Sequence, residues 1–273
     1  MPEFSLTKPT RPIHVGVVLM NRFVLTPPAP AGVPTPISEP PPVISPSNTP
    51  TFARARSITE ALDVVPVDLL HGLSYNFLEA MPTIIPEALK NQGLPIEFHW
   101  VSENGSKDTR ELSSGLHVTP TDSFATCPPL DIVLVGASHI DYVLTSNERA
   151  FIQKSYDACT AFMTVCGGVL VAVAAGLVAG KTVTGPRLML PQLRAMAPDA
   201  AAWVEKRYVH DGKLWTSGAL HNGLDMMAAF MRHTWPNDEG QKLSLVDFAL
   251  VAGSGIERDI DYKDEPLLDL PAA

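Results

Sequence analysis

The sequence places one cysteine, Cys166, in a setting suited to nucleophilic chemistry. Cys166 follows the apolar run at residues 161–165 and precedes Gly167 and Gly168. A strand that passes through such a turn into a helix is typical of a nucleophile elbow, which holds its side chain at the carboxyl end of a strand. The glycines permit the tight turn and let a substrate approach main-chain N–H groups. We therefore expect Cys166 to be a reactive centre.

The electrostatics of this turn lead to a prediction about the thiol. A helix that begins just after Gly168 directs its partial positive charge at the Cys166 sulfur. Such an N-terminus lowers a thiol pKa, so the sequence predicts thiolate near neutral pH, and the same amides can stabilise an oxyanion. An inert buried thiol is the alternative. That alternative suits Cys159, expected inside a helix, and Cys127, which precedes a Pro-Pro pair.

The sequence was also searched for motifs that bind metal ions or nucleotides. It contains no His-x-x-x-His pair placed on an expected helix, no Cys-x-x-Cys pair, and no glycine-rich phosphate loop after the first expected strand. We therefore expect no metal site and no nucleotide cofactor. Four histidines are assigned structural roles by default: His71, His99, His117 and His139. An odd set of three cysteines in a chain of 273 residues indicates a reducing, cytoplasmic setting.

Composition narrows the classes of partner. Of the 273 residues, 45% are hydrophobic and 18% are charged, enough for the core of one large domain. The net charge of −9 and the absence of a Lys/Arg cluster argue against nucleic acid and anionic membranes. Residues 161–180 are long and apolar enough for a membrane span, but the Gly167-Gly168 pair favours a buried strand followed by a helix. No signal peptide is expected, and the partner is expected to be a small molecule or another protein.

The hydrophobic pattern alternates between strands and helices. Strands are predicted at 13–20, 96–101, 131–135 and 161–165, and a hairpin at 203–209 and 214–217 with Asp211-Gly212 at its turn. Helices are predicted after Gly168, at 223–233, and from Ser146 as N-cap. Such alternation predicts an α/β fold with a parallel sheet covered on both faces.

Residues 27–57 interrupt this pattern. Ten of the 26 prolines lie between residues 26 and 50, where a helix or a strand ladder is excluded. We interpret 27–57 as a Pro-rich surface insertion within a single domain that spans 1–273. Residues 236–273 are interpreted as a C-terminal extension.

Three segments together resemble a known family. The first is Thr164-Val165-Cys166-Gly167-Gly168 with the Gly176-Leu177 and Gly180-Lys181 pairs. The second is 211–219 with 223–226, and the third is 61–66. They resemble the ThiJ/PfpI family of the class I glutamine amidotransferase-like superfamily, in particular its isocyanide-hydratase-like branch. The resemblance covers about 13–235 without the insertion. It implies a flavodoxin-like three-layer sandwich with a mostly parallel central sheet, and a homodimer.

The resemblance also implies roles for an acid and for backbone amides. Cys166 would be the nucleophile, and Asp63 the acid beside it, with a pKa raised by the neighbouring thiolate. Asp68 is a rival because the spacing from Asp63 to Pro66 is one residue short of the family pattern, and a helix cap is the alternative role for Asp63. Gly136 and Ala137 occupy the place of an oxyanion-binding glycine pair, beside Gly167 and Gly168.

One departure from the family concerns its histidine. Many relatives have a Thr-His pair after the helix that follows the nucleophile, but here Thr184 precedes Gly185. His221 lies, with Asn222, in a loop that borders the family's active site. His221 is either a substitute base or an exposed loop residue.

These expectations define a function and its alternatives. A cysteine-dependent enzyme that adds water to a small electrophile, such as an isocyanide, in specialised metabolism is the leading interpretation. Hydrolase, glyoxalase or deglycase-like chemistry is a variant of it. The other class is a non-catalytic redox sensor or small-molecule-binding protein, since reactive thiolates oxidise readily.

Overall fold

The computed structural model describes residues 4–21, 58–81, 85–237, 243–253, 258–265 and 267. The predicted Pro-rich insertion at 27–57 lies outside these residues, and the predicted extension at 236–273 is described in part.

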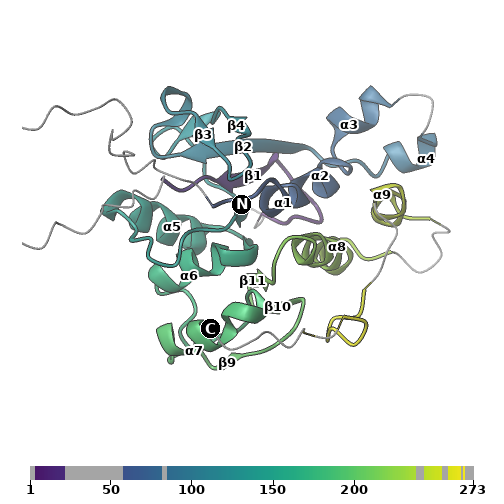
Figure 1. Ribbon diagram of the computed structural model, residues 1–273. Coiled ribbons are helices and arrows are strands. Elements are labelled where there is room, and N and C mark those ends of the chain that lie inside the picture. The colour runs from purple at the N-terminus through teal and green to yellow at the C-terminus, as the bar shows by residue number, and fades with distance from the viewer. Residues whose placement is uncertain are drawn as a thin grey trace, which may run out of the picture.

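A seven-stranded sheet forms the centre of the molecule (Figure 1). Every neighbouring pair is parallel except β10 and β11, which form the predicted antiparallel hairpin at one edge. The fold is therefore the expected α/β, flavodoxin-like architecture. The strands in spatial order are β10 Tyr208–Asp211, β11 Leu214–Ser217, β7 Ala161–Thr164, β6 Ile132–Val135, β1 Ile13–Val18, β2 Ile96–Ser102 and β5 Asp122–Ser123.

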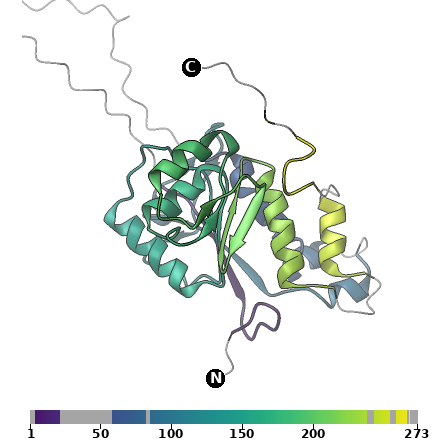
Figure 2. The ribbon, with the colours of Figure 1, turned by 90° about the horizontal axis from the view of Figure 1, so that it is seen from below.

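Two hydrophobic cores lie on opposite faces of this sheet, because both faces of the central strands are apolar. Val15 and Leu134 belong to one core, whereas Val18 and Val133 belong to the other. The first core includes residues of α1 Ala61–Val64, α2 Pro66–His71, α3 Tyr75–Ala80, α4 Glu87–Lys90, α8 Asn222–Thr234 and α9 Leu245–Gly253. The second includes residues of α5 Ser146–Ala158, α6 Val169–Ala174 and α7 Leu190–Met196. Figure 2 shows the resulting three layers.

Some boundaries differ from the sequence prediction. Trp203 belongs to a separate short strand, β9 Ala202–Trp203, which pairs with β8 Thr182–Val183 instead of continuing into the hairpin. The N-cap of α5 is Thr145 rather than Ser146, because Thr145 Oγ1 accepts the N–H of Glu148. Cys159 caps the end of α5 and does not lie within it. Two further strands, β3 Arg110–Glu111 and β4 His117–Val118, form a small ribbon.

The apolar stretch at 161–180 folds as the sequence predicts, into β7, a turn and α6. Within the described ranges, the helices are all too short or too polar to cross a bilayer.

The turn between β7 and α6 passes very close to the end of β6. A Cβ atom placed on Gly168 would lie 2.3 Å from the carbonyl oxygen of Val135 and 2.9 Å from that of Gly136. Gly168 itself has helical backbone angles, φ −60° and ψ −24°, which any residue can adopt. Glycine is required here for space and not for backbone freedom.

Gly168→Ala is therefore expected to lower the free energy of unfolding by about 2 kcal/mol or more, because backbone atoms of β6 must move. The measurement is urea unfolding followed by circular dichroism. Gly93→Ala is the matched control, since the atoms nearest to its Cβ belong to the side chains of Leu78 and Tyr75 and not to the backbone. Equal losses in the two variants would contradict this account.

Candidate functional site

Cys166 stands on a strained turn after β7. Its φ angle is +56°, in the left-handed region that non-glycine residues rarely adopt. The turn Cys166–Gly168 is a single 3₁₀ turn that leads into α6. The Cys166 N–H donates to the carbonyl oxygen of Gly218 at 3.0 Å, which ties the turn to the segment after β11. The strained turn is thus held in place by the segment that follows the neighbouring strand β11.

Two backbone amides are directed at the sulfur of Cys166. The N–H groups of Gly167 and Leu220 both donate to it, and each lowers its pKa. Leu220 also has a positive φ angle, +50°, in the turn between β11 and α8. Two separate turns therefore converge on one sulfur atom.

The buried carboxyl of Asp63 lies beside this sulfur. One of its oxygens is within 4.8 Å of the Cys166 sulfur, and a carboxylate oxygen of Glu60 is within the same distance of both. Oδ2 of Asp63 accepts the N–H groups of Glu60 at 2.9 Å and Ala137 at 3.1 Å. Oδ1 has no hydrogen-bond partner among the described residues. Asp63 thus caps α1 with one oxygen and leaves the other available to a proton, a substrate or water.

The charges of this pair are set by burial. Burial is the main cause that raises the pKa of Asp63 to about 6, against the opposing hydrogen bonds from Glu60 and Ala137. Burial first, and the charge of Asp63 second, raise the pKa of Cys166 to about 12. Between pH 6 and pH 12 the pair therefore holds one proton and one negative charge. Because the two groups interact, each step of the titration is a property of the pair and not of one residue.

The prediction that the pKa of the Cys166 thiol is lowered is therefore wrong. The helix α6 has only six residues, and the amide of Gly167 lowers the pKa less than burial and Asp63 raise it. The predicted raised pKa of Asp63 has the right direction, but burial rather than the neighbouring sulfur is its main cause.

A groove of about 520 Å³ opens over the sulfur. Its lining combines the elbow with the segments before α1, after β3 and after β6, and with the start of α7. The residues are Ile58, Glu60, Ser113, Ala137, Ser138, His139, Ile140, Cys166, Gly167, Met189 and Gln192. Carboxyl, imidazole, hydroxyl and amide groups thus share a cavity of small-molecule size.

The structure brings together some of the residues suggested by the sequence. Gly167 and Ala137 line the groove, but the N–H of Ala137 is already bonded to Asp63, so it is not a free oxyanion donor. The N–H of Gly168 is bonded to Val165 O at 2.8 Å. Gly136 provides space, since a Cβ there would lie 2.6 Å from Thr59 Cγ2.

Three of the suggested residues lie elsewhere. Asp68 is exposed on α2, so Asp63 is the acid beside the sulfur. His221 is exposed at the start of α8 and lines a second pocket, of about 400 Å³, whose lining does not include Cys166. Asn222 is buried, and its side chain bonds to Tyr262 and Arg258.

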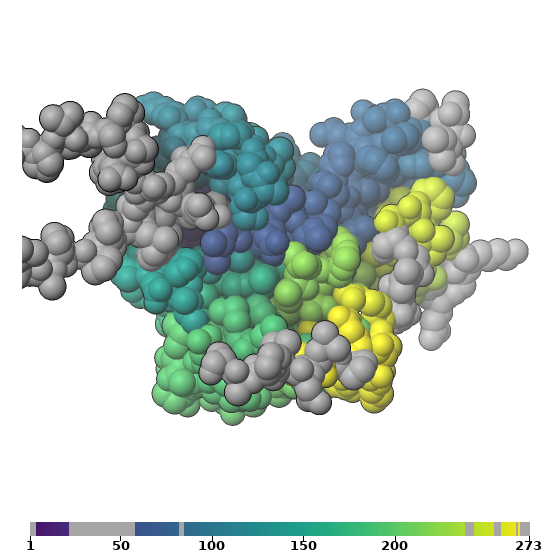
Figure 3. Space-filling view, viewed as in Figure 1, coloured from purple at the N-terminus to yellow at the C-terminus, as the bar shows by residue number. Residues whose placement is uncertain are grey.

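Asn222 belongs to a network that holds the C-terminal segment. The fully buried guanidinium of Arg207 contacts carboxylates of Asp264 and Glu265 at 2.7 and 2.8 Å. Figure 3 shows segment 258–265, in yellow, against the green part of the surface. Part of the predicted extension is thus packed against the domain around Arg207.

Sequence reasoning missed Glu60, His139 and Leu220. His139 follows Gly136-Ala137-Ser138 at the carboxyl end of β6, the end of a parallel sheet where sites form, and this position was an available signal. Leu220 contributes only its backbone, and no side-chain pattern could have indicated it.

The first test concerns the influence of Asp63 on the thiol. Asp63→Asn removes a negative charge near the sulfur and is expected to lower the pKa of Cys166 by about one unit or more. The measurement is the pH dependence of Cys166 alkylation by iodoacetamide, resolved by peptide mass spectrometry. Glu60→Gln, which removes a weaker influence on the same sulfur, should lower the pKa less. An unchanged profile in Asp63→Asn would show that the carboxyl does not act on the thiol.

The second test uses the pH dependence of stability. The folded-state pKa of Asp63, about 6, lies above its ordinary 3.8, so its stabilising contribution is complete below pH 3.8 and is lost as the pH rises through 6. Relative to Asp63→Asn, the wild-type protein should lose about 3 kcal/mol of unfolding free energy between pH 3.8 and 7. Urea unfolding of both proteins across this range measures it. A difference between them that does not vary with pH would contradict the raised pKa.

Known proteins are similar to this chain in sequence and in fold. A model of the DJ-1/PfpI family matches residues 75–233, more than half of the chain; this range contains Cys166 and begins after Asp63. Isonitrile hydratase of Pseudomonas putida is 32% identical over 138 residues, 49% of this chain and 58% of that protein. The chain thus spans less than two thirds of the length of this relative.

Two solved structures have the same fold. A ThiJ/PfpI family protein from Pseudomonas syringae superposes with a TM-score of 0.59 at 17% identity, over 92% of this chain and 79% of that one. Drosophila melanogaster DJ-1beta superposes with a TM-score of 0.55 at 14% identity, over 88% of this chain and 97% of that one. The family match, the fold and the cysteine on its strand-to-helix turn agree: the chain belongs to the DJ-1/PfpI family.

Proposed function

We propose that this protein is a cysteine-dependent enzyme that adds water to a small molecule with an electrophilic carbon, with isocyanides as the favoured substrates. The observation that carries the proposal is the pairing of the Cys166 sulfur with a buried Asp63 carboxyl whose pKa is raised to about 6. The similarity to isonitrile hydratase supports the choice of substrate class.

The terminal carbon of an isocyanide needs a nucleophile and a proton at the same atom. In the first step the sulfur of Cys166 bonds to this carbon, while the thiol proton passes through Asp63 to the carbon. The product of this step is an enzyme thioimidate, R–N=CH–S. Because the sulfur and the carboxyl lie close together, this one pair of groups can supply both the nucleophile and the proton.

Water completes the reaction. It adds to the thioimidate carbon as Asp63 accepts its proton, and the nitrogen becomes protonated. The C–S bond then breaks, and the sulfur regains a proton as the hydroxyl becomes the carbonyl of a formamide. The sum is RNC plus water giving RNHCHO. The amides of Gly167 and Leu220 stabilise the sulfur whenever it carries charge.

An amide hydrolysis is less well supported. It requires a base that activates the thiol and protonates a leaving amine, usually a histidine. In the described part of the chain, the ionisable side chains that shift the pKa of the Cys166 thiol are the carboxyls of Asp63 and Glu60, and neither is a histidine. His139 lines the groove, where its place suits contact with the substrate.

The test is a substrate panel of alkyl and aryl isocyanides, methylglyoxal and simple amides, with product formation followed by chromatography. We expect formamides from isocyanides, no turnover by Cys166→Ala, and a kcat about 10²–10⁴-fold lower in Asp63→Asn. His139→Gln should raise KM or lower kcat, whereas His221→Gln, outside the groove, should leave both unchanged. A folded protein that turns over none of these compounds would contradict the proposal, as would full activity in Cys166→Ala.

A redox role is the second candidate. Oδ1 of Asp63, which has no hydrogen-bond partner among the described residues, favours it, because an oxygen atom added to the sulfur could bond to a protonated carboxyl there. Peroxide treatment followed by intact-mass analysis separates the two roles. Selective oxygen addition at Cys166, together with no turnover across the panel, would favour the sensor.

A further inference from the structure

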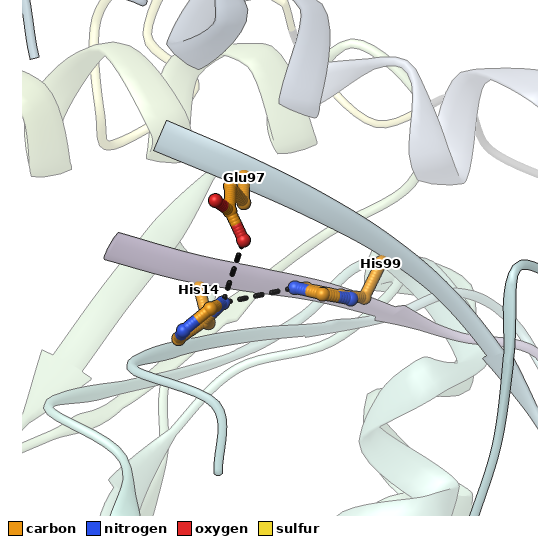
Figure 4. Close-up of side chains that lie close together, drawn as sticks. All are labelled: His14, Glu97 and His99. Atoms are coloured by element: carbon orange, nitrogen blue, oxygen red, sulfur yellow. Dashed lines mark hydrogen bonds and ion pairs between the residues drawn. The ribbon is translucent and has the colours of Figure 1, made fainter. Parts of the chain in front are cut away.

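A second cluster of ionisable side chains lies on β1 and β2 (Figure 4). None of its residues lines the groove. His14 Nδ1 lies 3.0 Å from His99 Nε2 and 3.5 Å from Glu97 Oε2. All three atoms lie within 4.8 Å of one another. We propose that His14, Glu97 and His99 form a binding site for a divalent transition-metal ion such as Zn²⁺.

The register of the two parallel strands creates this cluster. His14 pairs with Glu97, and His99 lies two residues further along β2, opposite Gly16. Glu97 and His99 share one face of β2 because side chains alternate along a strand. The Glu-x-His spacing on a strand was thus a signal that a search for helical His pairs could not detect.

The distances suit a metal ion. Zinc binds imidazole nitrogen at about 2.0–2.1 Å and carboxylate oxygen at about 2.0–2.2 Å, so two ligand atoms at a tetrahedral angle lie about 3.3–3.5 Å apart. The observed separations from His14 Nδ1, 3.0 and 3.5 Å, lie close to these values. Two histidines and one glutamate also leave a coordination position open to water.

The surroundings orient one ligand for this role. His99 Nδ1 lies 3.0 Å from Asp122 Oδ2. A carboxylate only accepts, so Nδ1 carries the proton and Nε2 presents its lone pair to the cluster. With this tautomer of His99, the 3.0 Å contact requires that His14 Nδ1 carries the proton and donates it to Nε2. A metal ion takes the place of that proton when His14 adopts its other tautomer.

The local charge also favours a cation. Among the described residues, Glu97 and Asp122 contact no Lys or Arg, whereas the nearby Asp131 is neutralised by two bonds from Arg11. The side chains of His14 and His99 are 18% and 14% exposed, while that of Glu97 is 55% exposed, so an ion can enter from the side of Glu97.

This site is separate from the cysteine. His14 and Glu97 are the second residues of their parallel strands, whereas Cys166 follows the end of β7. At about 3.3 Å per residue, the two sites are ~20 Å apart along the sheet. An ion here ties β1 to β2 and takes no part in chemistry at the sulfur.

The experiment is a calorimetric titration with Zn²⁺ of the full chain carrying Cys166→Ser, since Cys166, Asp63 and Glu60 could also bind zinc. We expect one ion per chain. Glu97→Gln should weaken binding at least tenfold, and His99→Gln should abolish it. Asp122→Asn keeps all three ligands but loses the bond that orients His99, and should weaken binding about 10–100-fold.

Matched controls and a second readout complete the test. Glu87→Gln and His117→Gln alter exposed residues outside the cluster and should leave the affinity unchanged. Zn²⁺ should raise the Tm of the Cys166→Ser protein, and the further Glu97→Gln substitution, at a half-exposed side chain, should reduce that rise without loss of folding. Absence of stoichiometric binding, or binding unaffected by Glu97→Gln and Asp122→Asn, would overturn the proposal. Because the background lacks the thiol, this result is independent of the enzyme assay.

Discussion

Burial of the Asp63 carboxyl against the Cys166 sulfur determines how both groups are protonated and which backbone groups must surround them. Two acidic groups this close, in a site largely removed from water, cannot both ionise near neutral pH, so they hold one proton between them. The backbone is arranged to support either location of the charge: two N–H groups donate to Oδ2 of Asp63, and two others to the sulfur. Such a pair can supply a nucleophile and an acid in one step.

Several chain segments must meet to build this arrangement. β7 ends at the strained Cys166, the turn before α8 supplies the amide of Leu220, and α1 is fixed over the end of β6 by Thr59 Oγ1, which donates to Ala137 O at 2.7 Å. Gly168 permits the close approach of the elbow to β6. The parallel sheet brings these carboxyl ends to one edge, where the groove forms.

The opposite end of the sheet is polar for a different reason. There, Asp131 accepts the N–H of His14 and binds Arg11, while His14, Glu97 and His99 face one another across β1 and β2. Polar groups at the amino ends of central strands must bond to one another or to a ligand, because burial of unpaired polar groups is unfavourable. The sheet thus separates a cysteine site at one end from a histidine cluster at the other.

The sequence alone determined the parallel sheet with six of its strands, all except β5, the helices α5, α6 and α8, the hairpin at Asp211-Gly212 and the elbow at Cys166. These features depend on local periodicity and on glycine spacing. Only the tertiary structure decided that Asp63 and not Asp68 meets the sulfur, that His139 and not His221 lines the groove, and that the amide of Ala137 is already bonded. It also reversed the predicted thiol pKa. Burial, and contacts between residues far apart in the chain, are set by packing, and no local spacing encodes them.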